Sequence, residues 1–143
     1  MQRRRFLGAA GGLATTALAG CAGLIGAADS SEPADYDVGM TASLFRPPEI
    51  EVAVGETVVW KNTNSRIHTV TAYEDSLPEG AAYFATGGFD SESAAREGYS
   101  NGLKGGIDSG QTYSHTFEVP GTYGYFCVPH ERAGMTGTVV VTE

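Results

Sequence analysis

The sequence predicts an all-β domain, a Greek-key β-sandwich with one short helix in a long inserted connection. Short runs of β-branched and aromatic residues are separated by turns of Gly, Pro, Asn and Asp, which is typical of short strands. Residues 49–54 alternate polar and apolar side chains, so one face of that strand is expected to lie in a core. Seven such runs in a chain of 143 residues suit one compact sandwich.

The first segment, residues 1–21, is predicted to be an export signal. Arg3, Arg4 and Arg5 precede an apolar, small-residue run over 7–19, which is too short to span a bilayer stably. The Arg-Arg-x-Phe-Leu arrangement resembles a twin-arginine signal, the route that exports folded proteins. A signal of the general secretory route is the alternative.

The export signal ends in Leu18-Ala19-Gly20-Cys21, which resembles a lipobox. Cleavage before Cys21 would expose it for lipidation, and two alkyl chains would hold the protein on the extracytoplasmic face of the cell membrane. The alternative is an ordinary cleavage region with an incidental cysteine. A disulfide between Cys21 and Cys127 is disfavoured, because each cysteine fits a local role better.

The folded domain is expected to cover residues 37–143, after a flexible linker over 22–36 that is rich in Gly, Ala, Ser, Asp and Pro. Strands are predicted at 38–45, 49–54, 57–62 and 67–73 and, after an insertion, at 112–119, 122–127 and 136–142. The insertion, residues 74–111, is long for a small domain, which is typical of a functional or family-specific feature. Within it, residues 90–97 are predicted to form a helix capped by Asp90 or Ser91.

The composition is acidic. The chain has 9 Lys and Arg against 17 Asp and Glu, a formal net charge of −8, which becomes −11 without the three arginines of the leader. Nucleic-acid phosphates would repel such a protein, so nucleic acid is not an expected partner. The charge favours either solubility at high salt, as in a halophile, or a basic docking partner.

The strongest chemical signal is Cys127-x2-His130-x4-Met135, which places a thiolate, an imidazole and a thioether in one tight loop. Sulfur ligands favour copper(I) and imidazole binds copper in both oxidation states, so two histidines, one cysteine and a weak axial methionine suit a copper ion that changes between them. His68, in the strand predicted at 67–73, is the candidate for the second histidine. We therefore predict one copper ion per chain.

From Val38 to the C-terminus the chain resembles a cupredoxin of the plastocyanin type, and in particular the halocyanins of salt-loving archaea. The resemblance rests on Val54-Gly55-Glu-Thr-Val-Val-Trp60-Lys-Asn62, on Tyr83-Phe84-Ala-Thr-Gly-Gly-Phe89, and on Gly121-Thr-Tyr-x-Tyr-Phe-Cys127-x-Pro-His130-x4-Met135-x-Gly137. It implies a type 1 (blue) copper held strongly by His68, Cys127 and His130, with Met135 weak and axial. It also implies that electrons pass through the solvent-facing edge of His130.

Two features depart from the plastocyanin pattern. Thr69 follows the first histidine where plastocyanins usually have Asn, although its hydroxyl can still make one of the hydrogen bonds that tie the ligand loops together. Glu131 and Arg132 place charge at the rim around the second histidine, where the family is commonly apolar. The docking face is therefore expected to be more polar than in plastocyanin.

The predicted function is electron transfer, with single electrons passing between membrane-associated redox partner proteins as copper cycles between Cu(I) and Cu(II). The protein is expected to be a monomer. It is not expected to be an enzyme, because catalytic copper centres need further imidazoles and His115, expected to face solvent, is the one histidine left. The alternative function is copper storage or delivery without redox duty, although such proteins tend to expose Met/His-rich sites and this chain has three methionines. Zinc in the same ligands would be mis-metallation.

Overall fold

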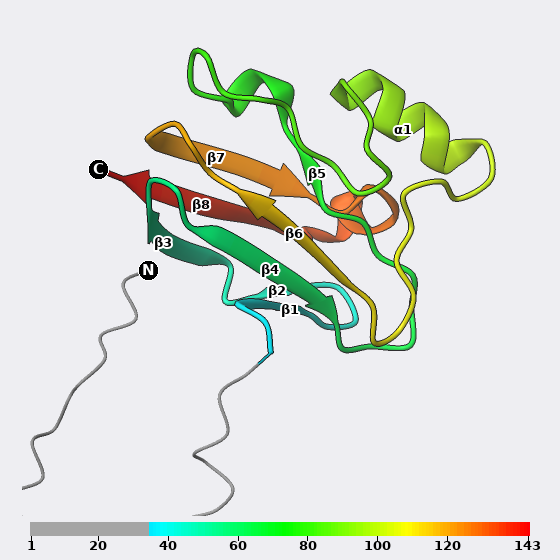
Figure 1. The fold of residues 1–143 in the computed structure, drawn as a ribbon. Coiled ribbons are helices and arrows are strands. Elements are labelled where there is room, and N and C mark those ends of the chain that lie inside the picture. The colour runs from blue at the N-terminus through cyan, green and yellow to red at the C-terminus, as the bar shows by residue number, and fades with distance from the viewer. Residues whose placement is uncertain (1–34) are drawn as a thin grey trace, which may run out of the picture. The chain divides into compact units, whose positions relative to one another are not determined.

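The computed structural model describes residues 35–143, of which Tyr36–Glu143 belong to one compact unit. In this part of the chain eight strands form two four-stranded sheets that pack as a sandwich (Figure 1). The first sheet has the order β2-β1-β4-β6, with β1 at Val38–Met40, β2 at Phe45–Arg46, β4 at Thr57–Asn62 and β6 at Thr112–Thr116. The second has the order β3-β8-β7-β5, with β3 at Glu49–Ala53, β5 at Thr71–Ala72, β7 at Gly121–Phe126 and β8 at Thr136–Thr142. The predicted all-β sandwich is confirmed.

Both sheets are mixed. β1 runs parallel to β4 and β3 runs parallel to β8, whereas the other pairs are antiparallel. The pairing of β3 with β8 places strands from the two ends of the domain side by side, in the register Ile50 to Val139. β8 therefore lies inside the second sheet, between β3 and β7, and leads directly from the loop that holds the predicted copper ligands.

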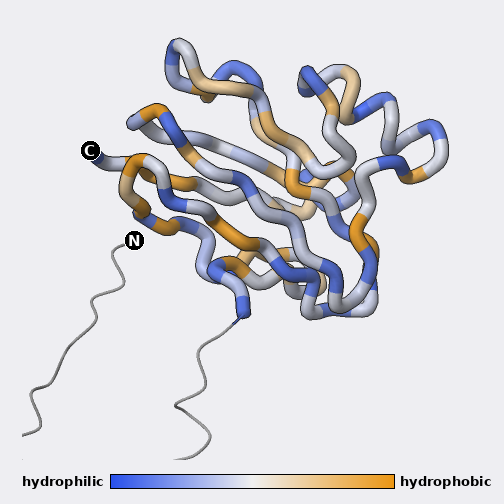
Figure 2. The backbone as a smooth tube through the Cα atoms, in the orientation of Figure 1, coloured by the Kyte–Doolittle hydropathy of each residue, from blue (hydrophilic) through white to orange (hydrophobic). Residues whose placement is uncertain are grey.

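The core explains why these residues form strands. Along β4 and β8 every second residue is buried, so β-branched and aromatic side chains pack inward while polar ones face out. Figure 2 shows the apolar residues recurring along the strands of both sheets. At the centre Trp60 has no exposed surface and lies edge-on to Tyr125, with ring centroids 5.4 Å apart. Trp60 is therefore one of the side chains around which the core packs.

The strands predicted at 38–45 and 67–73 differ most from the structure, and the one predicted at 112–119 ends at Thr116. The run at 38–45 folds back on itself as β1 and β2, because Thr41 and Leu44 close a turn with a backbone hydrogen bond of 2.9 Å. The run at 67–73 pairs as a strand only over β5, and its earlier residues form isolated contacts. By contrast, β4 and β8 begin and end where the sequence predicts.

The insertion contains two helical segments, the 3-10 helix η2 (Glu74–Ser76) and the α-helix α1 (Glu92–Ser100). The Ser91 side chain caps α1 by accepting a hydrogen bond from the backbone N–H of Ala94 at 3.1 Å, so of the two predicted caps it is the serine that acts. The helix extends three residues beyond its predicted end. Within the helix, Gly98 lets the Phe89 ring lie close to the helix backbone, because a Cβ at this position would collide with the ring.

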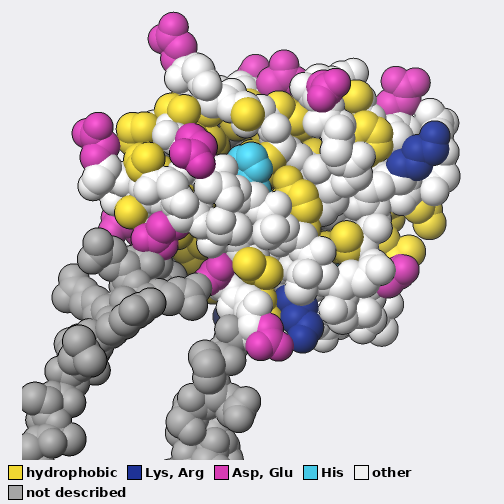
Figure 3. Space-filling model, viewed as in Figure 1, with side chains coloured by type: hydrophobic (Ala, Val, Ile, Leu, Met, Phe, Trp, Pro, Cys, Tyr) yellow, Lys and Arg dark blue, Asp and Glu magenta, His cyan; other side chains and the backbone are white. Residues whose placement is uncertain are grey.

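The predicted export signal, Cys21 with its predicted lipidation, and nearly all of the predicted linker lie outside the described residues. Within residues 35–143, no helix is both long and apolar enough to cross a membrane. Figure 3 shows acidic side chains spread over the visible face and basic side chains at few places. This face of the domain therefore carries part of the acidity seen in the composition.

Candidate metal centre

Two segments that are distant in the sequence supply the predicted ligands. Cys127 directly follows β7, and the 3-10 helix η3 (Val128–Ala133) then carries His130. His68 lies between β4 and β5. Because β5 pairs antiparallel with β7, the segment before β5 meets the loop after β7 at one end of the second sheet (Figure 1).

The structure brings His68, Cys127 and His130 together. Cys127 Sγ lies 3.6 Å from His68 Nδ1 and 3.4 Å from His130 Nδ1, and the three ligand atoms all lie within 4.8 Å of one another. Metal bonds to histidine nitrogen and cysteine sulfur are about 2.0 to 2.3 Å long, so such ligands around one ion stand about 3.5 Å apart. The three side chains therefore fit a single metal ion.

The protonation states of these groups suit metal binding. Burial, and then the neighbouring His130, lowers the pKa of His68 to about 4, and burial also lowers the pKa of His130. Both imidazoles are therefore neutral near pH 7, which is the form that binds a metal. Burial raises the pKa of the Cys127 thiol, so metal binding must displace its proton.

Met135, the fourth predicted residue, is fully buried where the loop returns to β8. Its C=O accepts a hydrogen bond from the Cys127 N–H at 3.0 Å, and its N–H donates to the His130 C=O at 3.2 Å. The chain reverses at Gly134, whose φ of 90° is a left-handed conformation that glycine adopts without strain. The methionine is thus fixed beside the cysteine and the second histidine.

Thr69 joins the two ligand segments. Its Oγ1 accepts a hydrogen bond from the Val128 N–H at 2.8 Å, and its own N–H donates to Cys127 Sγ at 3.4 Å. The prediction that a hydroxyl at this position can tie the loops together is confirmed. The N–H···S bond also favours the thiolate and so opposes part of the effect of burial.

Two supports of the ligand segments, both in the insertion, were not predicted from the sequence. Ile107 exchanges backbone hydrogen bonds with His68 at 3.3 and 2.8 Å, and Arg96 of α1 binds the Glu131 carboxylate of η3. No local spacing indicates either contact, because each joins segments more than thirty residues apart. Glu131, whose charge the sequence places at the rim of the second histidine, is paired with Arg96, which holds the pKa of its carboxyl below the usual range.

His115 lies outside the metal centre but is not the solvent-facing residue that the sequence predicts. It is half-buried, with its ring stacked on Phe84 at a centroid distance of 4.6 Å and edge-on to Phe117 at 4.8 Å. Burial accordingly lowers its pKa. The prediction fails because residues two apart in a strand share a face, so His115 lies on the inward side of β6 with Tyr113 and Phe117, where Phe84 from the insertion packs on it.

The β-sandwich and the buried set of two imidazoles and one thiol define a class, the small copper proteins known as cupredoxins. Residues 34–142 match the family model described as copper binding proteins, plastocyanin/azurin family. The chain belongs to this family. The prediction of copper as the cofactor is confirmed, with His68, Cys127, His130 and Met135 available for a single site.

Similar proteins agree with this assignment. The chain is 38% identical over 100 residues to the plastocyanin of Scenedesmus fuscus, a match that covers 70% of this chain and 88% of the relative. It is 36% identical over 138 residues to the chloroplastic plastocyanin of Oryza sativa subsp. indica, covering 96% and 80%. Among solved structures, a reduced tryptophan-to-tyrosine variant of amicyanin has a TM-score of 0.52 and 33% identity, covering 77% of this chain and 86% of that one.

A further solved structure, pseudoazurin from Methylobacterium extorquens AM1, has a TM-score of 0.54 with 23% identity, covering 74% of this chain and 73% of that one, and so supports the fold alone. Cupredoxins such as plastocyanin, amicyanin and pseudoazurin are electron carriers and not enzymes. The prediction that this chain is not an enzyme is therefore confirmed by its family. The narrower resemblance to halocyanins stays a prediction.

Proposed function

We propose that this protein is a type 1 copper electron carrier that passes single electrons between redox partner proteins. The observation that carries the proposal is the convergence of two neutral imidazole Nδ1 atoms on one buried thiol, at 3.4 and 3.6 Å from its sulfur. His68, Cys127 and His130 would hold the copper ion, with Met135 as a weaker fourth ligand, because thiolate, imidazole and thioether together suit copper in both oxidation states.

The residues around the site support this function. Copper supplies the chemistry, a centre that alternates between Cu(I) and Cu(II). Cys127 and His68 have no exposed surface, which excludes water from the inner side of the site, whereas His130 is partly exposed and offers its ring edge to a partner. Backbone hydrogen bonds of Met135 and a hydrogen bond accepted by the Thr69 hydroxyl fix the loop, so little rearrangement is needed when the charge of the centre changes.

We further propose that the protein is exported by the twin-arginine route and held on the extracytoplasmic face of the cell membrane through lipidated Cys21. The support is the arginine-led apolar segment, the lipobox and the Gly/Ala/Ser-rich linker. The acidic surface suits either a high-salt habitat, as for a halophile, or a basic partner. Mass spectrometry of the N-terminal peptide tests the anchor, and Cys21→Ala is expected to move the protein from the membrane to the soluble fraction.

The copper site is tested by titrating the purified protein with copper(II). We expect one copper per chain, an intense visible thiolate-to-copper band, narrow hyperfine splitting in the EPR spectrum, and bleaching by ascorbate. Cys127→Ser is expected to be colourless, while Cys21→Ser, a matched control that removes the other thiol, stays blue. Weak colour with more than one copper per chain would contradict electron transfer and favour copper storage or delivery.

A further inference from the structure

The insertion is tied to the copper-ligand loop by an ion pair. Arg96 of α1 binds Glu131 of η3 in a two-pronged contact, with Nη1 to Oε1 at 2.7 Å and Nη2 to Oε2 at 3.1 Å. Tyr73 donates its hydroxyl hydrogen to the same carboxylate at 2.6 Å. Glu131 is the residue directly after the ligand His130, so the contact acts on the ligand loop itself.

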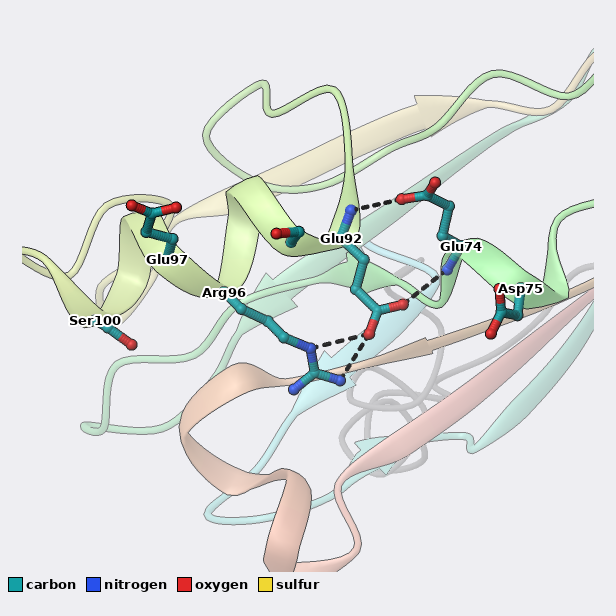
Figure 4. Close-up of a pocket in the computed structure, with 7 residues that line it drawn as sticks. Glu74, Asp75, Glu92, Arg96, Glu97 and Ser100 are labelled. Atoms are coloured by element: carbon teal, nitrogen blue, oxygen red, sulfur yellow. Dashed lines mark hydrogen bonds and ion pairs between the residues drawn. The ribbon is translucent and has the colours of Figure 1, made fainter.

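Contacts with residues other than Glu131 also fix the position of the Arg96 side chain. Its Nε and Nη2 bind the Glu92 carboxylate at 2.9 and 2.8 Å, one helical turn earlier (Figure 4). Glu92 and Glu74 in turn accept hydrogen bonds from each other's backbone N–H groups, which joins α1 to η2 (Figure 4). The guanidinium also lies over the Phe126 ring, 4.2 Å from its centroid. The Arg96 guanidinium is therefore held in position by contacts that do not involve Glu131.

The opposite end of the insertion holds the other ligand segment. Ile107 exchanges two backbone hydrogen bonds with His68, and its C=O accepts a further one from the Asn62 side chain at 2.9 Å. The insertion thus contacts both halves of the metal centre, at His68 through its backbone and at the 127–135 loop through Arg96.

The loop depends on such a contact because η3 packs weakly. The 3-10 helix has no fully buried residue, and short 3-10 turns have poorer hydrogen-bond geometry than an α-helix. Elements with few buried contacts open locally at low cost in free energy. Hydrogen bonds between charged groups are stronger than neutral ones, and a two-pronged arginine-carboxylate pair also fixes orientation.

We propose that Arg96 is a positioning residue for the copper centre, which acts through Glu131 to hold η3, and with it His130, in one place. The inserted helix is then the element that keeps the exposed ligand from moving when copper changes its oxidation state. The part of this inference that concerns copper rests on the proposed function, whereas the clamping of the loop does not.

The test compares Arg96→Ala with Arg132→Ala. Each variant removes one positive charge that acts on Glu131, but only the first removes the hydrogen bonds. In the copper-free protein we expect backbone amides of residues 128–135 to exchange with deuterium about tenfold faster in Arg96→Ala, the size expected for charged hydrogen bonds, and to be unchanged in Arg132→Ala. After copper loading, the EPR hyperfine splitting and the reduction potential are expected to change in Arg96→Ala beyond the change in Arg132→Ala.

Arg96→Lys keeps the charge but cannot bind both carboxylate oxygens in the same way, so its loop exchange is expected to fall between those of the wild-type protein and Arg96→Ala. If Arg96→Ala does not fold, loop exchange in Arg96→Lys still tests whether Arg96 holds the loop. Equal loop exchange in the wild-type protein and these Arg96 variants would overturn the clamp. Equal spectra and potentials in Arg96→Ala and Arg132→Ala would overturn its role at copper. The exchange experiment needs no copper, so its result is independent of whether the electron-carrier proposal holds.

Discussion

The two segments that bear the copper ligands are held in opposite ways. His68 is completely buried and exchanges two backbone hydrogen bonds with Ile107. The side chain of the buried Asn62 donates a hydrogen bond to the C=O of the same Ile107. The segment after β7 carries His130 on a short 3-10 helix with no fully buried residue, and a side-chain ion pair to α1 ties it down. The inner ligand depends on burial and on backbone bonds to a distant segment, whereas the outer ligand depends on backbone bonds within its own loop and on side-chain contacts to other segments.

This difference follows from what each ligand must do. An electron carrier needs one ligand that reaches the surface, since electrons must pass between the metal and a partner over a short path. A residue with an exposed edge cannot be fixed by packing on all sides, so its support must come from directed contacts such as those of Arg96 and Thr69. The buried histidine has no such constraint.

The largest effect is expected from replacing each histidine by glycine. Both His68→Gly and His130→Gly should lose the blue colour, because two strong ligands are too few for a type 1 site. Imidazole added to the solution should restore the colour in His130→Gly, where the missing ring leaves an opening to solvent, and not in His68→Gly, where the space is enclosed. Visible absorption of the copper-loaded variants measures both results.

The contrast between a buried and an exposed ligand would be contradicted if imidazole restored the blue colour equally in the two variants. Such a result would show that the His68 side opens to solvent as readily as the His130 side. Circular dichroism of the copper-free variants is the control, because each must keep the β-sandwich for its colour to be informative.

The strands β4 and β8 and the loop with three of the four candidate ligands were predictable from local sequence patterns. β4 and β8 matched their predicted bounds because alternating β-branched residues define both a strand and its buried face. The ligands Cys127, His130 and Met135 could be identified because they share one short loop, and their chemistry is evident from their spacing. His68 was a candidate because the loop lacks a second imidazole, and the resemblance to a known family added weight, since a single distant histidine is more often an ordinary core or surface residue than a metal ligand.

The supports of the site could not be predicted, for a physical reason. The ion pair of Arg96 with Glu131 and the bridge of Ile107 to His68 depend on how the insertion folds back over the sheet. No period of two or of 3.6 residues encodes such a contact. The prediction for the half-buried His115 failed for a different cause, because residues two apart in a strand share a face and His115 therefore lies on the inward side of β6 with Tyr113 and Phe117.

A smaller effect is expected at Asn62, which supports the inner ligand. Its Nδ2 donates to the C=O groups of Arg66 and Ile107 at 2.7 and 2.9 Å, and its Oδ1 accepts from the Asn64 N–H at 2.9 Å. Asn62→Ala leaves these groups without their partner, so the free energy of unfolding of the copper-free protein should fall by about 1 to 3 kcal/mol. Urea unfolding followed by Trp60 fluorescence measures it.

The matched control is Asn64→Ala, in the same turn of the chain. The Asn64 side chain accepts one exposed hydrogen bond, from the Arg66 N–H at 2.9 Å, so its loss should cost less than that at Asn62. Equal losses in the two variants would contradict the view that a buried polar anchor fixes the inner ligand.

The smallest effect is expected at Thr69, where the two segments meet. Thr69→Val removes the oxygen that accepts from the Val128 N–H at 2.8 Å and nearly preserves the shape of the side chain. We expect the free energy of unfolding to fall by about 1 kcal/mol, and Thr69→Ser, which keeps the hydroxyl, to lose less. Because the bond joins the inner segment to the outer loop, Thr69→Val should also speed amide exchange in η3 while leaving the Ile107 amide protected. Faster exchange at Ile107 as well would mean that the two segments open together, and that their different supports do not make them independent.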